Sequence, residues 1–281
     1  MRPMRRLTGL LAASSLAAFA ASTPARNGSA VNPVALRLDP YFRDLRTIQV
    51  STRTSTLTML FDTGGGATVI SPQIAARRGC TPFGRDVGHR MTGDSVEFRQ
   101  CDALEMEVGS WRARVAPVGV FDVNALLPSE LPRVDGLIGL DAFRDRVVTI
   151  DWPANRISVH SKSDAEAAVR AHGVEVRLAT GESGRFLSAF VAVEAARGPL
   201  WFLLDSGNMR GALVAPHVLR DARLELGPNK NASLRIGRRP PMVVQVEVTD
   251  LDIDGALGTE FLNRGPVTID LRPARPAAPE R

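Results

Sequence analysis

The chain has 281 residues, of which 44% are hydrophobic and 5% aromatic, so it is long enough for one large core or two ordinary ones. Its formal charge is +5, but acids lie between the basic residues and no aromatic residues are interleaved with them, so we expect no nucleic-acid partner. The 24 glycines and 19 prolines separate short apolar runs of Val, Leu and Ile. This pattern predicts an all-β chain with few helices.

The N-terminus predicts export. Residues 1–21 carry Arg2, Arg5 and Arg6, then a short apolar run that ends in a small-x-small cleavage pattern. These features are typical of a secretory signal peptide, so we expect a secreted or periplasmic protein with no stable membrane span after cleavage. An uncleaved N-terminus that anchors the chain is the alternative. Residues 22–40 are expected to be a flexible segment.

The first distinctive motif is "LFDTGGGATVIS", at residues 60–71. An apolar strand, preceded by a predicted hairpin, ends at Asp62, and Thr63 and Gly64 follow it. A strand and a short helix are predicted next, because Pro72 stands where the first turn of a helix favours proline. Residues 41–160 are expected to form an N-terminal lobe.

The chain has two cysteines, Cys80 and Cys101. Disulfides persist in exported proteins, and a bridge here would close a loop of about 20 residues, worth roughly 3 kcal/mol on the chain-entropy model. A pair of unlinked buried thiols is the alternative. Neither cysteine has the spacing of a metal site or a redox pair, and the four histidines are scattered, so we expect no metal and no cofactor.

A second copy of the motif follows at residues 201–216, "WFLLDSGNMRGALVAP". Asp205, Ser206 and Gly207 again end an apolar strand, and a proline again opens a short helix. Matching segments close both halves, "DGLIGLDAFRDRVVTID" at 135–151 and "DGALGTEFLNRGPVTID" at 254–270. We therefore expect two homologous lobes, the second over 174–271, joined by a linker or short helix at 161–173. The Pro-rich residues 272–281 are expected to be a disordered tail.

The two halves differ in length between helix and turn. The separation from Asp62 to Gly109 is 47 residues, against 32 from Asp205 to Gly237, so the first half holds about 15 extra residues. The surplus covers "FGRDVGHRMTGDSVEFRQC", a polar segment that contains glycines and could form a hairpin of its own.

Two D-[ST]-G motifs, each ending an apolar strand and each matched downstream by apolar-apolar-Gly, resemble the pepsin/retropepsin-like aspartic protease family from about residue 47 to 270. "DTGGGATVI" is similar to the retropepsin form, and two copies in one chain are similar to the pepsin arrangement. The resemblance implies two closed or partly open β-barrel lobes that meet at a cleft, with short helices after each motif strand, and a monomeric enzyme.

The resemblance also implies roles for individual residues. Asp62 and Asp205 would be the catalytic pair, Thr63 and Ser206 would lock the two loops, and Gly64 and Gly207 would let the backbone pass close to the carboxylates. The apolar-Gly segments would pack behind the loops, and a flap from the first lobe, within residues 88–98, would close over a peptide or protein substrate. The packing residues are Leu137, Ile138, Gly139, Ala256, Leu257 and Gly258, and the flap candidates are Met91, Thr92, Gly93 and Asp94.

Paired carboxylates have a defined chemistry. Two carboxylates about 3 Å apart repel by roughly 5 kcal/mol at an effective dielectric constant near 20, so they share one proton and provide one acid and one base. This pair can activate a water for peptide hydrolysis without metal or covalent intermediate. Gly65 and Asn208 stand where pepsin-like motifs carry a hydroxyl donor, so we predict a raised acidic pKa and a pH optimum nearer 5 to 6 than 2.

Three alternatives remain. Pepsin-like flaps carry a tyrosine, whereas Tyr41 is the single tyrosine here and lies outside the flap segment, so the chain could be a non-catalytic module that keeps the cleft for binding peptides. An enzyme active only as a dimer of chains is another possibility. "DLDIDG" at 250–255 matches the start of an EF-hand loop, but Phe261 occupies the twelfth position, which favours a strand over a calcium site.

Overall fold

The computed structural model describes residues 33–181, 184–195, 197–221, 224 and 226–273. The predicted signal peptide at 1–21 and the tail from 274 onward lie outside these residues, as do 22–32 of the predicted flexible segment. In the part of the chain that the structure describes, no helix has the length and apolar character to cross a membrane.

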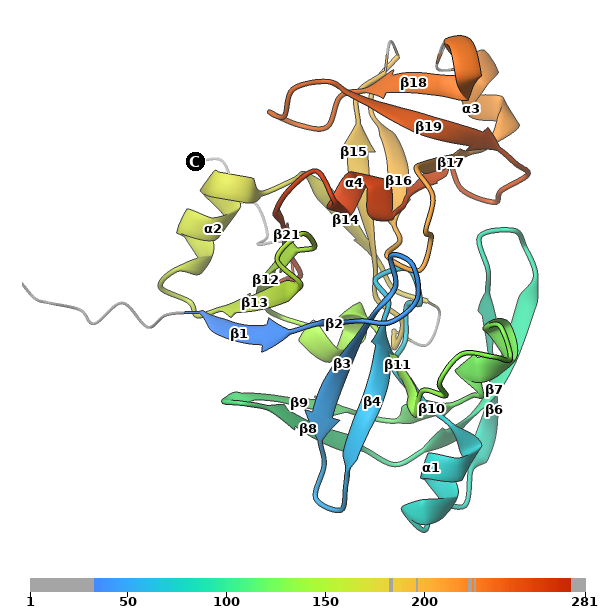
Figure 1. Cartoon of the computed structure of the whole chain (residues 1–281), viewed down its shortest axis with the longest axis vertical. Coiled ribbons are helices and arrows are strands. Elements are labelled where there is room, and N and C mark those ends of the chain that lie inside the picture. The colour runs from blue at the N-terminus through green and yellow to red at the C-terminus, as the bar shows by residue number, and fades with distance from the viewer. Residues whose placement is uncertain (1–32, 182–183, 196, 222–223, 225, 274–281) are drawn as a thin grey trace, which may run out of the picture. The chain divides into compact units, whose positions relative to one another are not determined.

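Two sheets carry the two copies of the repeat (Figure 1). Over the described residues, the first sheet has the order β6-β7-β10-β5-β11-β4-β3-β8-β9, with β2 beside β3, and the second has the order β14-β15-β16-β20-β17-β19-β18. The strands of the first sheet are β2 (Asp39–Pro40), β3 (Arg46–Ser51), β4 (Thr56–Phe61), β5 (Val69–Ile70), β6 (Phe83–His89), β7 (Ser95–Cys101), β8 (Leu104–Val108), β9 (Trp111–Val115), β10 (Val118–Val120) and β11 (Gly136–Ile138). Those of the second are β14 (Val176–Ala179), β15 (Ser188–Val193), β16 (Leu200–Leu204), β17 (Ala212–Val214), β18 (Asn231–Leu234), β19 (Met242–Val248) and β20 (Gly255–Leu257).

The two sheets share one topology. The strand that leads to each motif pairs in parallel with the apolar-apolar-Gly segment of its own lobe, β4 with β11 and β16 with β20. The strand after each motif pairs antiparallel with that same segment, β5 with β11 and β17 with β20. The predicted all-β fold of two homologous lobes is confirmed.

The helices are few and short. Ser71 caps α1 because its Oγ accepts a hydrogen bond from the Ile74 N–H at 3.2 Å, and Pro72 fills the first turn. The helices α1 and α3 follow the motif strands of the two lobes, as predicted, and α2 lies within the predicted linker. The helices are α1 (Pro72–Arg77), α2 (Ala165–His172), α3 (Pro216–Asp221) and α4 (Thr259–Leu262), with 3₁₀ turns η1 (Val123–Leu126), η2 (Leu140–Phe143) and η3 (Pro228–Lys230).

A third sheet draws strands from both halves of the chain. Its order is β1-β13-β12-β21, with β1 (Val34–Arg37), β12 (Val147–Asp151), β13 (Arg156–His160) and β21 (Val267–Asp270). β12 and β21 are the matching "VTID" ends of the repeat, and they pair antiparallel with Thr149 opposite Thr268. The Oγ1 atoms of these two threonines are 2.7 Å apart. The two copies of the repeat therefore pair directly with each other.

This sheet corrects two predictions. Residues 34–40 were expected to be flexible, but they form β1 and β2, because β1 pairs with β13 and buries Leu36 completely. The disordered tail was expected to begin at residue 272, but the Arg272 guanidinium pairs with Asp270 at 2.6 Å and Glu166 at 3.1 Å. Each stretch has a partner far away in the sequence, β13 for β1 and Glu166 for Arg272.

Aromatic side chains pack beneath the first motif. Phe61, which directly precedes Asp62, is 1% exposed and lies edge-on to Phe143 with ring centroids 6.2 Å apart. Trp111 stacks on Phe143 at 4.8 Å. A disulfide joins Cys80, just after α1, to Cys101 at the end of β7, with Cα atoms 6.0 Å apart. The loop that follows Phe61 is therefore held on a well-packed base.

Candidate active site

Asp62 and Asp205 each stand where a strand ends. The Asp62 N–H donates to the Ile138 carbonyl oxygen at 3.1 Å, and the Asp205 N–H donates to that of Leu257 at 2.9 Å. Each aspartate is thus held by the last residue of the parallel strand beside it. The predicted packing residues lie in β11 and β20 and in Gly139 and Gly258, which directly follow these strands.

Thr63 and Ser206 cross between the two loops. The Thr63 N–H donates to Ser206 Oγ at 3.0 Å, and the Ser206 N–H donates to Thr63 Oγ1 at 3.0 Å. Each hydroxyl also donates to a carbonyl of the other lobe, Thr63 to Leu204 at 2.7 Å and Ser206 to Phe61 at 3.3 Å. Both side chains are fully buried, so these four bonds are shielded from water.

The two carboxyl groups meet. The Gly207 N–H donates to an oxygen of each one, at 3.1 Å for Asp62 and 2.9 Å for Asp205, so one backbone donor lies between the two side chains. Gly64 adds a backbone donor to Asp62 at 2.8 Å. A Cβ at position 207 would lie 2.8 Å from Asp62 Oδ2, so the close approach requires glycine.

Burial and mutual repulsion shift the titration of this pair. Loss of hydration raises the pKa of Asp62 above its ordinary value, while the backbone N–H groups of Gly64, Gly207 and Gly65 oppose that rise. Burial and the negative charge of Asp62 raise the pKa of Asp205 to about 8. One proton is therefore retained between the two groups through the mildly acidic range.

The position after each D-[ST]-G provides no side-chain donor to the carboxylates. Gly65 has no side chain, and a Cβ there would lie 3.3 Å from Asp62 Oδ2. Asn208 accepts from the Arg210 N–H through Oδ1 at 3.1 Å, and its buried Nδ2 has no hydrogen-bond partner among the described residues. Asn208 reaches Asp205 through its backbone N–H, at 3.2 Å.

Sequence reasoning missed the support of the first loop. Thr68 donates through Oγ1 to Asp141 Oδ1 at 2.6 Å and through its N–H to Oδ2 at 2.9 Å, and its Oγ1 accepts from the Gly139 N–H at 3.2 Å. Burial raises the pKa of Asp141, and the bonds from Thr68 oppose that rise. Asp141 follows the apolar-Gly segment by two residues, which is the signal that could have identified it.

The predicted flap is a hairpin of β6 and β7, whose turn runs from Arg90 to Asp94. At its tip, the Met91 carbonyl oxygen accepts from the Asp252 N–H of the second lobe at 3.0 Å. Within the turn, Thr92 Oγ1 donates to Asp94 Oδ2 at 2.8 Å. The four flap candidates therefore lie at the tip of a hairpin that reaches the opposite lobe.

The acids of the EF-hand-like segment do not gather. Asp252 meets the flap, whereas Asp254 accepts from the Trp201 N–H at 2.9 Å and lies 3.2 Å from His217 Nε2. Across the described residues, no three His, Cys, Asp or Glu side chains are placed to hold a metal ion.

Two all-β lobes that bring paired Asp-hydroxyl-Gly loops into contact define an aspartic-protease-like protein. Residues 48–142 match a family model described as aspartyl protease, which confirms the predicted resemblance to the pepsin/retropepsin-like aspartic protease family. No curated protein sequence matches the chain. Among solved structures, basic 7S globulin from soybean is similar, with 10% sequence identity and a TM-score of 0.49 over 85% of this chain and 92% of that one.

Proposed function

We propose that the chain is an exported aspartic endopeptidase in which Asp62 and Asp205 activate a water molecule against a peptide bond. The observation that carries the proposal is the contact between the two carboxyl groups, with one Gly207 N–H donating to both. Such a pair holds a single proton, which gives an acid and a base in one place.

The surroundings of each carboxyl group support an assignment of roles. Asp62 and Asp205 each accept two backbone hydrogen bonds, so these bonds do not distinguish them. Burial and the negative charge of Asp62 raise the pKa of Asp205 to about 8, so we assign the retained proton to Asp205. Asp62 takes a proton from water as the water oxygen attacks the peptide carbonyl carbon, and Asp205 protonates the carbonyl oxygen. Collapse of the resulting diol returns a proton to Asp205, Asp62 protonates the departing nitrogen, and the C–N bond breaks.

Export and a monomeric state belong to the same proposal. The N-terminal sequence favours export, and a Cys80–Cys101 disulfide suits an oxidising compartment. Both aspartates come from one chain, so a second copy is not needed to complete the pair. A dimer-dependent enzyme would instead show a specific activity that rises with protein concentration.

The alternative is a peptide-binding module without turnover. The flap favours it, because its tip carries Met91 and Thr92 without a tyrosine and is hydrogen-bonded to the second lobe. Such a module would bind unfolded peptides in the intact protein and leave them uncut.

The experiment is cleavage of an unfolded protein by the purified chain at pH 4 to 6. We expect cleavage that pepstatin inhibits and that either Asp62→Asn or Asp205→Asn abolishes. Asp102→Asn is the matched control, because Asp102 is exposed and distant in sequence from both motifs. Binding without cleavage by the unmodified protein would replace the proposal with the alternative.

A further inference from the structure

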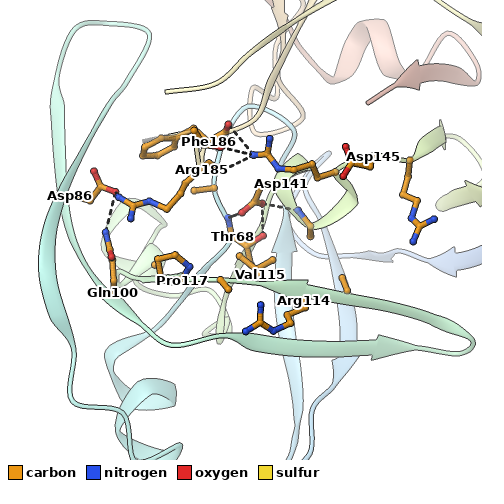
Figure 2. Close-up of a pocket in the computed structure, with 18 of the residues that line it drawn as sticks. Thr68, Asp86, Gln100, Arg114, Val115, Pro117, Asp141, Asp145, Arg185 and Phe186 are labelled. Atoms are coloured by element: carbon orange, nitrogen blue, oxygen red, sulfur yellow. Dashed lines mark hydrogen bonds and ion pairs between the residues drawn. The ribbon is translucent and has the colours of Figure 1, made fainter. Parts of the chain in front are cut away.

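A loop of the second lobe lies against the first lobe beside the flap. It leads into β15, and its Leu187 N–H donates to the carbonyl oxygen of Gly66, in the first motif, at 2.7 Å. Figure 2 shows Arg185 of this loop directed toward Asp86 of the flap. Residues of this loop and of the first lobe together line a pocket of about 390 Å³.

One arginine of the first lobe holds the backbone of this loop. Arg144 Nη2 donates to three successive carbonyl oxygens, those of Gly184 at 3.1 Å, Arg185 at 3.0 Å and Phe186 at 3.4 Å. Arg144 directly follows η2, which also contains the Asp141 that braces Thr68. Asp141, which supports the Asp62 loop, and Arg144, which holds the second-lobe loop, thus belong to one continuous segment.

Arg185 connects the loop to both flap strands. It forms an ion pair with Asp86 of β6, and Asp86 also accepts from Gln100 Nε2 of β7 at 3.3 Å. The side chain of Asp86 is 17% exposed and that of Arg185 is 33% exposed, so the pair is partly shielded from solvent. Removing one partner from such a pair leaves an uncompensated charge.

Phe186 adds an apolar contact to the same strands. Its ring lies edge-on to Phe98 of β7, with centroids 5.9 Å apart, and a Cβ at Gly88 of β6 would lie 3.6 Å from it. Edge-to-face aromatic pairs are favourable beyond the area that they bury. The two strands of the flap are therefore fixed to the second lobe by a charge and by a ring.

We propose that Arg185 is a positioning residue that sets the direction of the flap. A hairpin held along its strands by the opposite lobe keeps its tip against Asp252 of that lobe only when the two lobes keep their relative register. Through Arg185, Asp86 and Arg144, a change in the second-lobe loop moves the flap and the brace of the Asp62 loop together. The effect on turnover rests on the proposed peptidase function, whereas the effect on the flap does not.

The test is hydrogen exchange of the flap amides in the full chain, combined with steady-state kinetics. We expect Arg185→Gln to speed exchange over residues 83–101 about tenfold, and to raise KM about tenfold while kcat changes less than about twofold. Asp86→Asn should do the same, and the charge-exchanged pair Arg185→Asp with Asp86→Arg should restore much of the protection. Arg235→Gln is the control, because it breaks a more exposed ion pair, with Glu194, that lies within the second lobe and, among the described residues, does not contact the flap.

Two outcomes would overturn the proposal. One is flap exchange in Arg185→Gln that equals that of the unmodified protein, and the other is an equal acceleration by Arg235→Gln. Faster exchange in a protein that cuts no peptide would support the flap anchor and reject the peptidase function, so the two failures are distinguishable. If Arg185→Gln does not fold, Asp86→Asn measures the same anchor from the flap side.

Discussion

The two aspartate loops follow the same strand pairing but have different support. The first is braced by side chains, since Thr68 and Asp141 join it to η2. The second is braced by backbone, since the Gly258 N–H donates to Gly211 at 2.8 Å and the Thr259 N–H donates to Asn208 at 2.9 Å. A duplicated motif can therefore keep its geometry while each copy reaches it by different bonds, and substitutions at matching positions should differ in cost.

The aspartates themselves should act as one unit despite their different surroundings. Because general acid-base groups contribute about 10²–10⁴-fold, we expect Asp62→Asn and Asp205→Asn each to lower kcat/KM by about 10³-fold. The double variant should be no worse than either single variant, since residues that act together are not additive. Kinetics on a defined peptide measures this, and independent losses that multiply would contradict the pairing.

Thr63 and Ser206 should contribute about equally to stability, because each hydroxyl accepts a hydrogen bond from the backbone of the other loop. Thr63→Val and Ser206→Ala each leave buried donors or acceptors unsatisfied, so each should lower the free energy of unfolding by about 1–3 kcal/mol. The double-mutant cycle should show a coupling of about 0.5–3 kcal/mol. Urea denaturation gives the values, and strictly additive losses would mean that the two residues act separately.

The threonines that lie outside the D-[ST]-G motifs, Thr68 and Thr259, should differ most between the two lobes in their contribution to stability. Thr68→Val removes a hydroxyl that serves Asp141 and the Gly139 N–H, so it should cost about 1–3 kcal/mol. Thr259→Val is a control for the substitution itself, in the second lobe opposite Leu140 of the repeat, because Thr259 Oγ1 is buried and has no hydrogen-bond partner among the described residues. That variant should be neutral or slightly stabilising, and equal losses at both sites would erase the distinction.

The stability of the protein should depend on pH through the ionisation of the buried Asp205. Its pKa is raised in the folded state from an unfolded value of about 3.9, so its contribution is fully present at low pH and is lost as pH rises from about 4 to about 8. Asp205→Asn cannot ionise, so it should become more stable than the unmodified protein as pH rises through this window. Thermal unfolding at pH 4, 6 and 8 tests the sign.

The features that local sequence patterns determine, the motif strands and the short helices after them, could be predicted from the sequence. Each aspartate ends an apolar run, and Pro72 and Pro216 open the helices that follow, so the motif strands and short helices could be placed in advance. The pairing of Asp62 with Asp205 was predicted from a family resemblance, which the two copies of the motif made specific. The hydrogen bonds between Thr63 and Ser206 are consistent with that prediction.

Local patterns could not predict which residues far apart in the sequence would pair. The "VTID" copies were recognised as repeats, but nothing in either one indicated that Thr149 would lie opposite Thr268. Leu36 is part of a four-residue strand, too short to show alternation, and its burial depends on β13. Arg185 belongs to a loop whose role comes from the flap that it meets, 99 residues away at Asp86.

The pH profile of kcat/KM for peptide cleavage tests the central claim, a single proton shared by two touching carboxyl groups. Asp62 must be ionised and Asp205 protonated at once, so the profile should be bell-shaped. Because Gly65 and Asn208 provide no side-chain donor to the carboxylates, we expect its maximum at about pH 5 to 6. A maximum below about pH 3, or a profile with one limb that Asp205→Asn leaves unchanged, would contradict it.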